Sequence, residues 1–152
     1  GMTRYKSGLL LALKAPLDER GRAIVWEMPD PARLFAMERL QSADLKLWAK
    51  AELSVQADGK NVPGGIADIL VLPNGTIALA ATASGIRPKQ QTGSLWHAPL
   101  PTNGLLQAKR IQAFPGLKPE GLALSPNAGR LAVAFDANRE IPSFLERSWP
   151  AK

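Results

Sequence analysis

An apolar hairpin that occurs twice is the feature that most constrains the fold of this chain. In its first copy, the runs 65–72 and 76–82 flank the turn Pro73-Asn74-Gly75. Asn-Gly favours the positive φ angles of a tight turn, so the two runs should pair antiparallel. Both runs are apolar on both faces, which places them between neighbouring sheets rather than at a half-solvated surface. The second copy has the runs 119–124 and 130–136 around the turn 125–129.

The element that follows each hairpin repeats as well. The segment 94–99 follows the first hairpin and 143–150 follows the second, while an earlier, partial copy consists of 9–14 and 22–29. Self-similarity of this kind predicts small sheets repeated around an axis. Two further strands are expected between the copies, over 43–55 and over 106–114.

The order of these strands predicts the fold class. The two hairpin turns occupy the place of the connection between the first and second strands of a propeller blade, counted outward from the axis. The strands then read as the last three of one blade, four of the next and the first three of another. The fold class is therefore all-β, a partial β-propeller of about two and a half four-stranded blades. Residues 1–152 form one propeller segment, in which Gly1 and Met2 are interpreted as a tag remnant and start.

One segment departs from the strand pattern. Asp30 can cap a helix and Pro31 can occupy its first position, which favours a short helical turn through Ala36. A longer helix through Trp48 is the alternative, and it competes with the alternating apolar pattern of 43–55.

Composition excludes several classes of function. The chain has no cysteine, which excludes disulfides, thiolate metal sites and cysteine nucleophiles. Its formal net charge is +6, but the basic residues are scattered without aromatic neighbours, so no nucleic-acid partner is expected. The longest apolar run, Leu9–Leu13, is too short for a membrane span or for a signal peptide.

An open half ring would leave two sheet faces bare. Large apolar faces seldom stay exposed, so they should be covered either by self-association or by the missing half of a parent propeller.

Two stretches, 64–70 (Gly-Gly-Ile-Ala-Asp-Ile-Leu) and 118–126 (Lys-Pro-Glu-Gly-Leu-Ala-Leu-Ser-Pro), resemble bacterial propellers called esterase-like or phytase-like. They are also similar to related propellers of unknown function. The resemblance covers Gly8 to Trp149. It implies a longer bacterial parent propeller, often periplasmic or secreted, with a phosphoester-hydrolase activity. The sequence itself does not fix the compartment.

The strand order also predicts a functional face. The long connections all fall on one side of the sheets, and long loops on a rigid scaffold commonly carry binding sites. Asp68 and Glu120 should lie near the axis on that side, with Lys14, Thr82 and Asp136 at equivalent strand ends. Two converging carboxylates could bind a hard cation such as Ca²⁺ or act as an acid–base pair. The long connections are 15–21, 56–64, 83–93, 115–118 and 137–142.

Each candidate also has a structural interpretation. Asp68 and Glu120 could accept hydrogen bonds from backbone amides of neighbouring blades, Asp136 could form a turn, and Lys14 could be a solvated strand end. His97 is the only histidine, which excludes a catalytic triad and a multi-histidine metal site within one copy, and surface packing is expected for it. The residues expected to pack between blades are Trp26, Trp96 and Trp149.

Two functions remain open. The first is a non-catalytic scaffold that binds a ligand or partner on its long-loop face. The second is a metal-assisted phosphoester or ester hydrolase that uses Asp68 and Glu120 once the ring is completed. Fold alone does not separate them, because propellers host unrelated functions.

Overall fold

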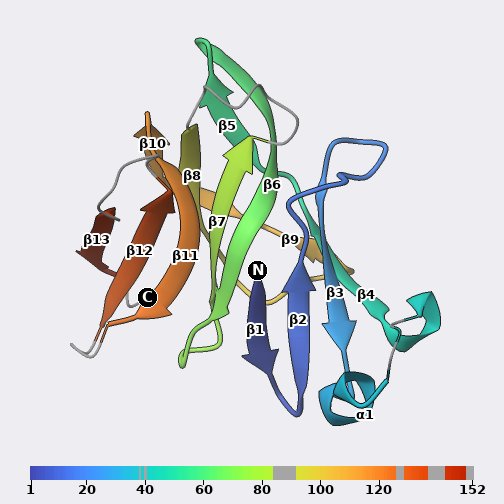
Figure 1. Cartoon of the computed structure of the whole chain (residues 1–152). Coiled ribbons are helices and arrows are strands. Elements are labelled where there is room, and N and C mark those ends of the chain that lie inside the picture. The colour runs from blue at the N-terminus through green and yellow to red at the C-terminus, as the bar shows by residue number, and fades with distance from the viewer. Residues whose placement is uncertain (38, 40, 84–91, 126–128, 137–142, 150–152) are drawn as a thin grey trace.

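The computed structural model describes residues 1–37, 39, 41–83, 92–125, 129–136 and 143–149, and it shows an all-β chain of three sheets. Sheet 2 lies between sheets 1 and 3 (Figure 1). Sheet 1 has the order β1 (Met2–Tyr5), β2 (Gly8–Ala12), β3 (Ala23–Met28), β4 (Lys46–Ala51) and β9 (Leu105–Leu106). Sheet 2 has the order β10 (Lys109–Pro115), β8 (Thr92–Ala98), β7 (Ile77–Ala83), β6 (Lys60–Val71) and β5 (Ser54–Ala57). Sheet 3 has the order β11 (Lys118–Leu124), β12 (Arg130–Asp136) and β13 (Ser143–Ser148).

Both predicted hairpins are confirmed. β6 pairs antiparallel with β7, and β11 pairs antiparallel with β12. In the first turn the backbone N–H of Leu72 donates to the carbonyl of Thr76 at 2.9 Å, and Gly75 has φ 79°. The side chain of Asn74 accepts from the N–H of Thr76 at 3.0 Å. The Asn-Gly pair thus forms the turn for the reason that the sequence suggested.

Sheet 1 has a first strand that sequence analysis missed. β1 pairs antiparallel with β2, and Gly1 extends the pairing through two backbone hydrogen bonds with Ala12, at 2.9 and 3.0 Å. β1 lies against β6, and the N–H of Val71 donates to the hydroxyl of Thr3 at 3.3 Å. The expectation that the first group of strands lacks its inner member is therefore wrong. We call β1, β6 and β11 the inner strands, because β1 and β11 both contact β6.

The single strand predicted over 43–55 is two strands. β4 ends at Ala51, and β5 begins at Ser54 and pairs with the first residues of β6. The turn between β5 and β6 is Asp58-Gly59, both in the left-handed region with φ of 49° and 70°. The connection predicted over 56–64 is therefore a hairpin rather than an open loop.

The strand predicted over 106–114 is also divided. β9 pairs parallel with β4 at the outer edge of sheet 1, whereas β10 pairs antiparallel with β8 in sheet 2.

The predicted helical turn is confirmed, and the longer helix is wrong. α1 covers Pro31–Phe35, and the carboxylate of Asp30 accepts from the N–H of Arg33 at 3.1 Å. A 3₁₀ turn at Ser42–Asp44 and then β4 follow, since the alternating apolar pattern there favours a strand. In the part of the chain that the structure describes, no helix has the length and apolar character to cross a membrane.

Two apolar cores join the sheets. The core between sheets 1 and 2 includes Leu10, Leu79 and Trp96, and the core between sheets 2 and 3 includes Leu131 and Trp149. The prediction that Trp96 and Trp149 pack between sheets is confirmed. Trp26 lies opposite Leu11 on the other face of sheet 1 and is half-buried there.

Candidate functional site

Two of the predicted loop segments that the structure describes lie on one side of the sheets. The connection between β2 and β3 and the β5–β6 turn lie at the top of Figure 1, whereas the short β1–β2 and β6–β7 turns lie at the bottom. The long connection between β3 and β4, which carries α1, lies at the bottom with the short turns, so the long connections do not all lie on one side as predicted. The predicted loops 84–91 and 137–142 lie outside the described residues.

Charged side chains from three segments meet on this side. Glu120, near the start of β11, accepts from the ammonium of Lys14 at 2.7 Å and from that of Lys118 at 2.6 Å, both at Oε1. The ammonium of Lys118 also lies 3.5 Å from the carboxylate of Asp136. We call these four residues the ionic cluster. It connects the end of the β2 strand in sheet 1 to the inner edge of sheet 3, over a sequence separation of 106 residues.

The electrostatics of the ionic cluster favour the charged forms of Glu120 and Lys118. Burial raises the pKa of Glu120, but the hydrogen bonds from Lys118 and Lys14 outweigh it, and the pKa lies below its ordinary value of 4.5. The hydrogen bond to Glu120 raises the pKa of Lys118 above 10.5. At neutral pH the ammonium of Lys118 therefore lies beside the carboxylate of Glu120. The side chain of Lys14 remains 41% exposed, so its ammonium can reach a ligand from solvent.

A β-bulge sets the geometry of this cluster. Pro119 pairs with Phe135 and Gly121 pairs with Ala134, so Glu120 is the extra residue of β11. A bulge shifts the register by one residue, and Lys118 consequently lies directly opposite Asp136. Lys118 is the cluster member that sequence analysis did not select. Its position beside the Pro-Glu-Gly motif was visible, but an unbulged register would pair Asp136 with another residue.

Lys14 is positioned by a close approach of two backbones. The carbonyl of Leu13 accepts from the N–H of Ile66 at 3.0 Å, which connects the end of β2 to β6. A β-carbon built on Gly65 would collide with the carbonyl oxygen of Lys14. Only glycine at position 65 therefore allows the chain at Lys14 to lie against β6 in this way.

Asp68 holds two inner strands together. Its Oδ2 accepts from the N–H of Leu122 in β11 at 2.7 Å, and its Oδ1 accepts from the N–H of Ile69 at 2.9 Å. The structural interpretation of Asp68 as a backbone acceptor is confirmed. Glu120 differs from that interpretation, because its partners are lysine ammonium groups.

The structure brings together Lys14, Glu120 and Asp136, whereas Thr82 takes no part in the ion pairs shown for them. Thr82 lies opposite Gly65 in the β6–β7 ladder and is 1% exposed. Its hydroxyl has no hydrogen-bond partner among the described residues. Thr82 is thus a packing residue of sheet 2 in the part of the chain that the structure describes.

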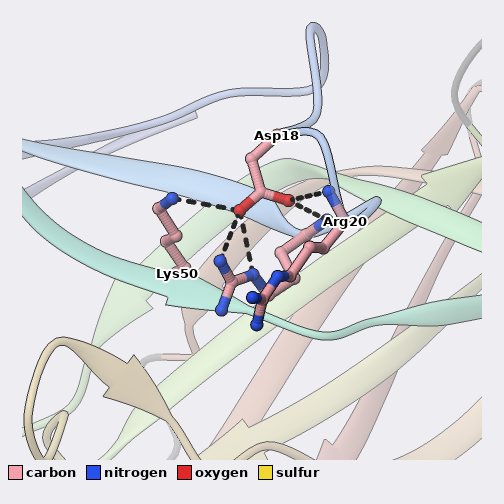
Figure 2. A network of polar contacts seen from close by, with 4 residues as sticks. Asp18, Arg20 and Lys50 are labelled. Carbon is pink, nitrogen blue, oxygen red and sulfur yellow. Dashed lines mark hydrogen bonds and ion pairs between the residues drawn. The ribbon is translucent and has the colours of Figure 1, made fainter.

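The connection that follows Lys14 is fixed by Asp18 (Figure 2). The carboxylate of Asp18 accepts from the backbone and guanidinium of Arg22, from the ammonium of Lys50 at 3.0 Å and from the N–H of Arg20 at 3.0 Å. These donors, first the backbone N–H and side chain of Arg22, hold the pKa of Asp18 well below its usual range. Sequence analysis missed this network, although the spacing of Asp18 and Arg22 was a signal.

His97 lies at the contact between sheets 2 and 3. Its ring meets Trp149 edge to face, with 5.5 Å between ring centroids and an interplanar angle of 75°. Burial lowers the pKa of His97 below its ordinary value of 6.5. The predicted surface packing is thus a half-buried contact with a core tryptophan.

We predict that acid weakens the contact between sheets 2 and 3 through His97. Because the folded pKa of His97 is depressed, protonating the ring costs more free energy in the folded state than in the unfolded state. Above pH 6.5 the ring is neutral in both states, so the folded state has its full stability there. The free energy of unfolding should fall as the pH drops below 6.5, towards the folded pKa. Urea unfolding of the wild type and of His97→Gln at pH 7.5 and 5.5 tests this. The variant should lose less stability than the wild type over that interval, and an equal loss would contradict the prediction.

Comparison with known proteins leaves the geometry as the guide to function. No family model, no curated protein and no solved structure gives a significant match to this chain. The resemblance based on 64–70 and 118–126 therefore stays a prediction.

Proposed function

We propose that this chain is a β-propeller segment whose long-loop face binds a small ligand or partner segment bearing a carboxylate or phosphate group. Support for the propeller comes from the order of the sheets. Apart from β9, which pairs parallel with β4, the strands of each sheet pair antiparallel in chain order, and β6 contacts the inner strands β1 and β11 of the sheets on either side. Radially repeated sheets have this connectivity.

The observation that carries the binding proposal is the pair of lysines on one oxygen of Glu120. An ammonium group has three N–H donors, and Lys14 uses one of them for Glu120. Its side chain is 41% exposed, so its other donors can meet an incoming oxyanion. Lys118 stands beside it with a 28% exposed side chain. The shared carboxylate thus holds two ammonium groups side by side, and Lys14 keeps donors for an incoming oxyanion.

The alternative function is metal-assisted hydrolysis of a phosphoester or ester. The observation that favours it is the place of Asp68 and Glu120, on neighbouring inner strands. The donor set fits a cation such as Ca²⁺ poorly. Both oxygens of Asp68 accept from backbone amides, and Oε1 of Glu120 is shared by two ammonium groups. Among the described residues, no group of three His, Asp or Glu side chains lies close enough to hold a metal. The binding scaffold is therefore the better-supported function.

We predict that Lys14→Met weakens anion binding about tenfold, the effect of losing one hydrogen bond to a charged group. Inorganic phosphate and citrate are the probes, and isothermal titration calorimetry at low salt measures the affinity. Lys46→Met is the matched control, because Lys46 is exposed at the start of β4, next to the connection that carries α1 on the opposite side of the sheets. Equal weakening in both variants, or no binding of either anion by the wild type, would overturn the proposal.

The same proteins test the alternative. Hydrolysis of p-nitrophenyl phosphate that requires a divalent cation and disappears in Glu120→Ala would favour the hydrolase. The binding proposal expects no such activity.

A further inference from the structure

The ionic cluster carries as many carboxylates as ammonium groups. Lys14 and Lys118 supply its positive charges. Its negative charges come from Glu120 and Asp136. Burial raises the pKa of Glu120, but the hydrogen bonds from the two lysines hold it below 4.5, so this carboxylate is ionised at neutral pH. An incoming anion is therefore attracted by the ammonium groups and repelled at the same short range by Glu120.

The carboxylate of Glu120 already fills the position that suits an oxyanion best. Its Oε1 accepts from the ammonium of Lys14 at 2.7 Å and from that of Lys118 at 2.6 Å. Two donors that reach one oxygen of Glu120 are close enough together to reach one oxygen of a ligand as well. Glu120 and a ligand oxyanion therefore suit the same position between the two ammonium groups.

Glu120 is held less firmly than the carboxylate of Asp68 on the neighbouring inner strand. The two oxygens of Asp68 accept from the backbone N–H groups of Ile69 and Leu122, at 2.9 and 2.7 Å. Those donors are fixed by the strands that carry them. The donors to Glu120 are lysine side chains, which have several rotatable bonds. The side chain of Glu120 is 32% exposed, so it can turn towards solvent.

The backbone around the cluster anchors the lysines more firmly than Glu120. The chain at Lys14 is fixed against β6 by the close approach at Gly65. Lys118 pairs with Asp136 in the ladder of β11 and β12. Glu120 is the extra residue of the bulge, so it has no partner in that ladder. The carboxylate is therefore the member of the cluster that can be exchanged.

We infer that Glu120 is an internal competitor of the ligand, and that an incoming phosphate group displaces its carboxylate and takes its place between Lys14 and Lys118. The inference rests on the proposed anion site and adds its regulation and its preferred ligand. A ligand in this position makes the connection between sheets 1 and 3 that Glu120 makes in the structure. Displacing Glu120 costs free energy, so the ligand must interact with the lysines more strongly than a carboxylate does. A phosphate group meets this requirement, because it carries more charge and three acceptor oxygens.

Glu120→Gln tests the inference by isothermal titration calorimetry with inorganic phosphate at pH 7.5 and an ionic strength of about 0.1 M. Glutamine keeps the size of the side chain and removes its charge. Phosphate should therefore bind the variant at least about tenfold more tightly than it binds the wild type. A gain in affinity is diagnostic, because damage to the fold or misplaced lysines would weaken binding instead. Acetate is the second probe, and the wild type should bind it more weakly than phosphate.

Glu146→Gln is the matched control for the change in net charge. Glu146 lies in β13 of the same sheet, its side chain is 29% exposed, and it also pairs with a cation, Arg130. Its carboxylate accepts from the hydroxyl of Ser125, just beyond the far end of β11. Five residues of extended strand, roughly 16 Å, separate Ser125 from Glu120. At the ionic strength of the titration, charges more than about 10 Å apart are largely screened, so phosphate affinity should change less than about threefold.

The outcomes separate this inference from the proposed site. If phosphate binds Glu120→Gln no more tightly than the wild type while Lys14→Met weakens binding, the anion site stands and competition by Glu120 is wrong. An equal gain in Glu146→Gln, or acetate binding the wild type as tightly as phosphate, would also overturn the inference. Absence of phosphate binding by both the wild type and Glu120→Gln would overturn the site and the inference together.

Discussion

Replacing Gly65 with alanine is expected to lower the free energy of unfolding by about 3 kcal/mol, the upper part of the range for overpacked sites. The new β-carbon would collide with the carbonyl oxygen of Lys14 and would lie 2.9 Å from its Cα. These are backbone atoms, so no side-chain rotation relieves the collision. The chain at Lys14 must move away from β6, which also breaks the 3.0 Å hydrogen bond from Ile66 to Leu13.

Gly121→Ala is the control for this substitution. A β-carbon on Gly121 would meet only the Cβ of Ala134, at an ordinary 3.6 Å. The free energy of unfolding of Gly121→Ala should stay within about 1 kcal/mol of the wild-type value. Alanine lowers the conformational entropy of the unfolded chain, so a small increase in stability is expected. Urea unfolding followed by tryptophan fluorescence compares the two variants. Equal stability of Gly65→Ala and Gly121→Ala would show that the close approach of β2 and β6 is not needed.

Local sequence signals predicted those parts of the fold that local chemistry determines. Asn74-Gly75 determines a turn, and the turn determines the register of β6 on β7. Asp30 and Pro31 likewise predict α1 because capping acts within a few residues. The antiparallel pairing of consecutive strands follows from these turns together with the apolar runs.

The predictions from sequence were wrong where contacts between strands distant in the chain, rather than local sequence, determine the structure. β1 is a short, polar strand that is exposed or half-buried along its length, and it is ordered by pairing with β2 and by contact with β6. The β5–β6 hairpin depends on a turn at Asp58, a non-glycine residue in the left-handed region, which sequence patterns predict weakly.

The candidate site was predicted in part. Lys14, Glu120 and Asp136 were selected as strand-end residues, and the structure connects them through Lys118. Sequence alone could not join Lys14 to Glu120, because the contact depends on the packing of sheet 1 on sheet 2. It could not select Lys118 either, since the bulge at Glu120 decides which residue faces Asp136.

Leu79→Ala and Leu131→Ala are each expected to cost about 3 kcal/mol of stability, within the range for leucines truncated in a core. Leu79 is fully buried between sheets 1 and 2, and Leu131 is fully buried between sheets 2 and 3. Leu100→Ala is the control, because Leu100 is 43% exposed, and its cost should be below about 1 kcal/mol. Urea unfolding measures all three variants.

The same pair of variants shows whether the three sheets unfold together. Sheet 2 contributes to both cores, so neither core can open without removing apolar cover from it. If the unit is cooperative, Leu131→Ala should speed amide hydrogen exchange in β2 and β3 of sheet 1 as much as in β12. Faster exchange confined to sheet 3 would mean that this sheet detaches by itself. Its inner strand carries Glu120 and Lys118, so the ionic cluster would then open and close with the docking of sheet 3 rather than with the whole fold.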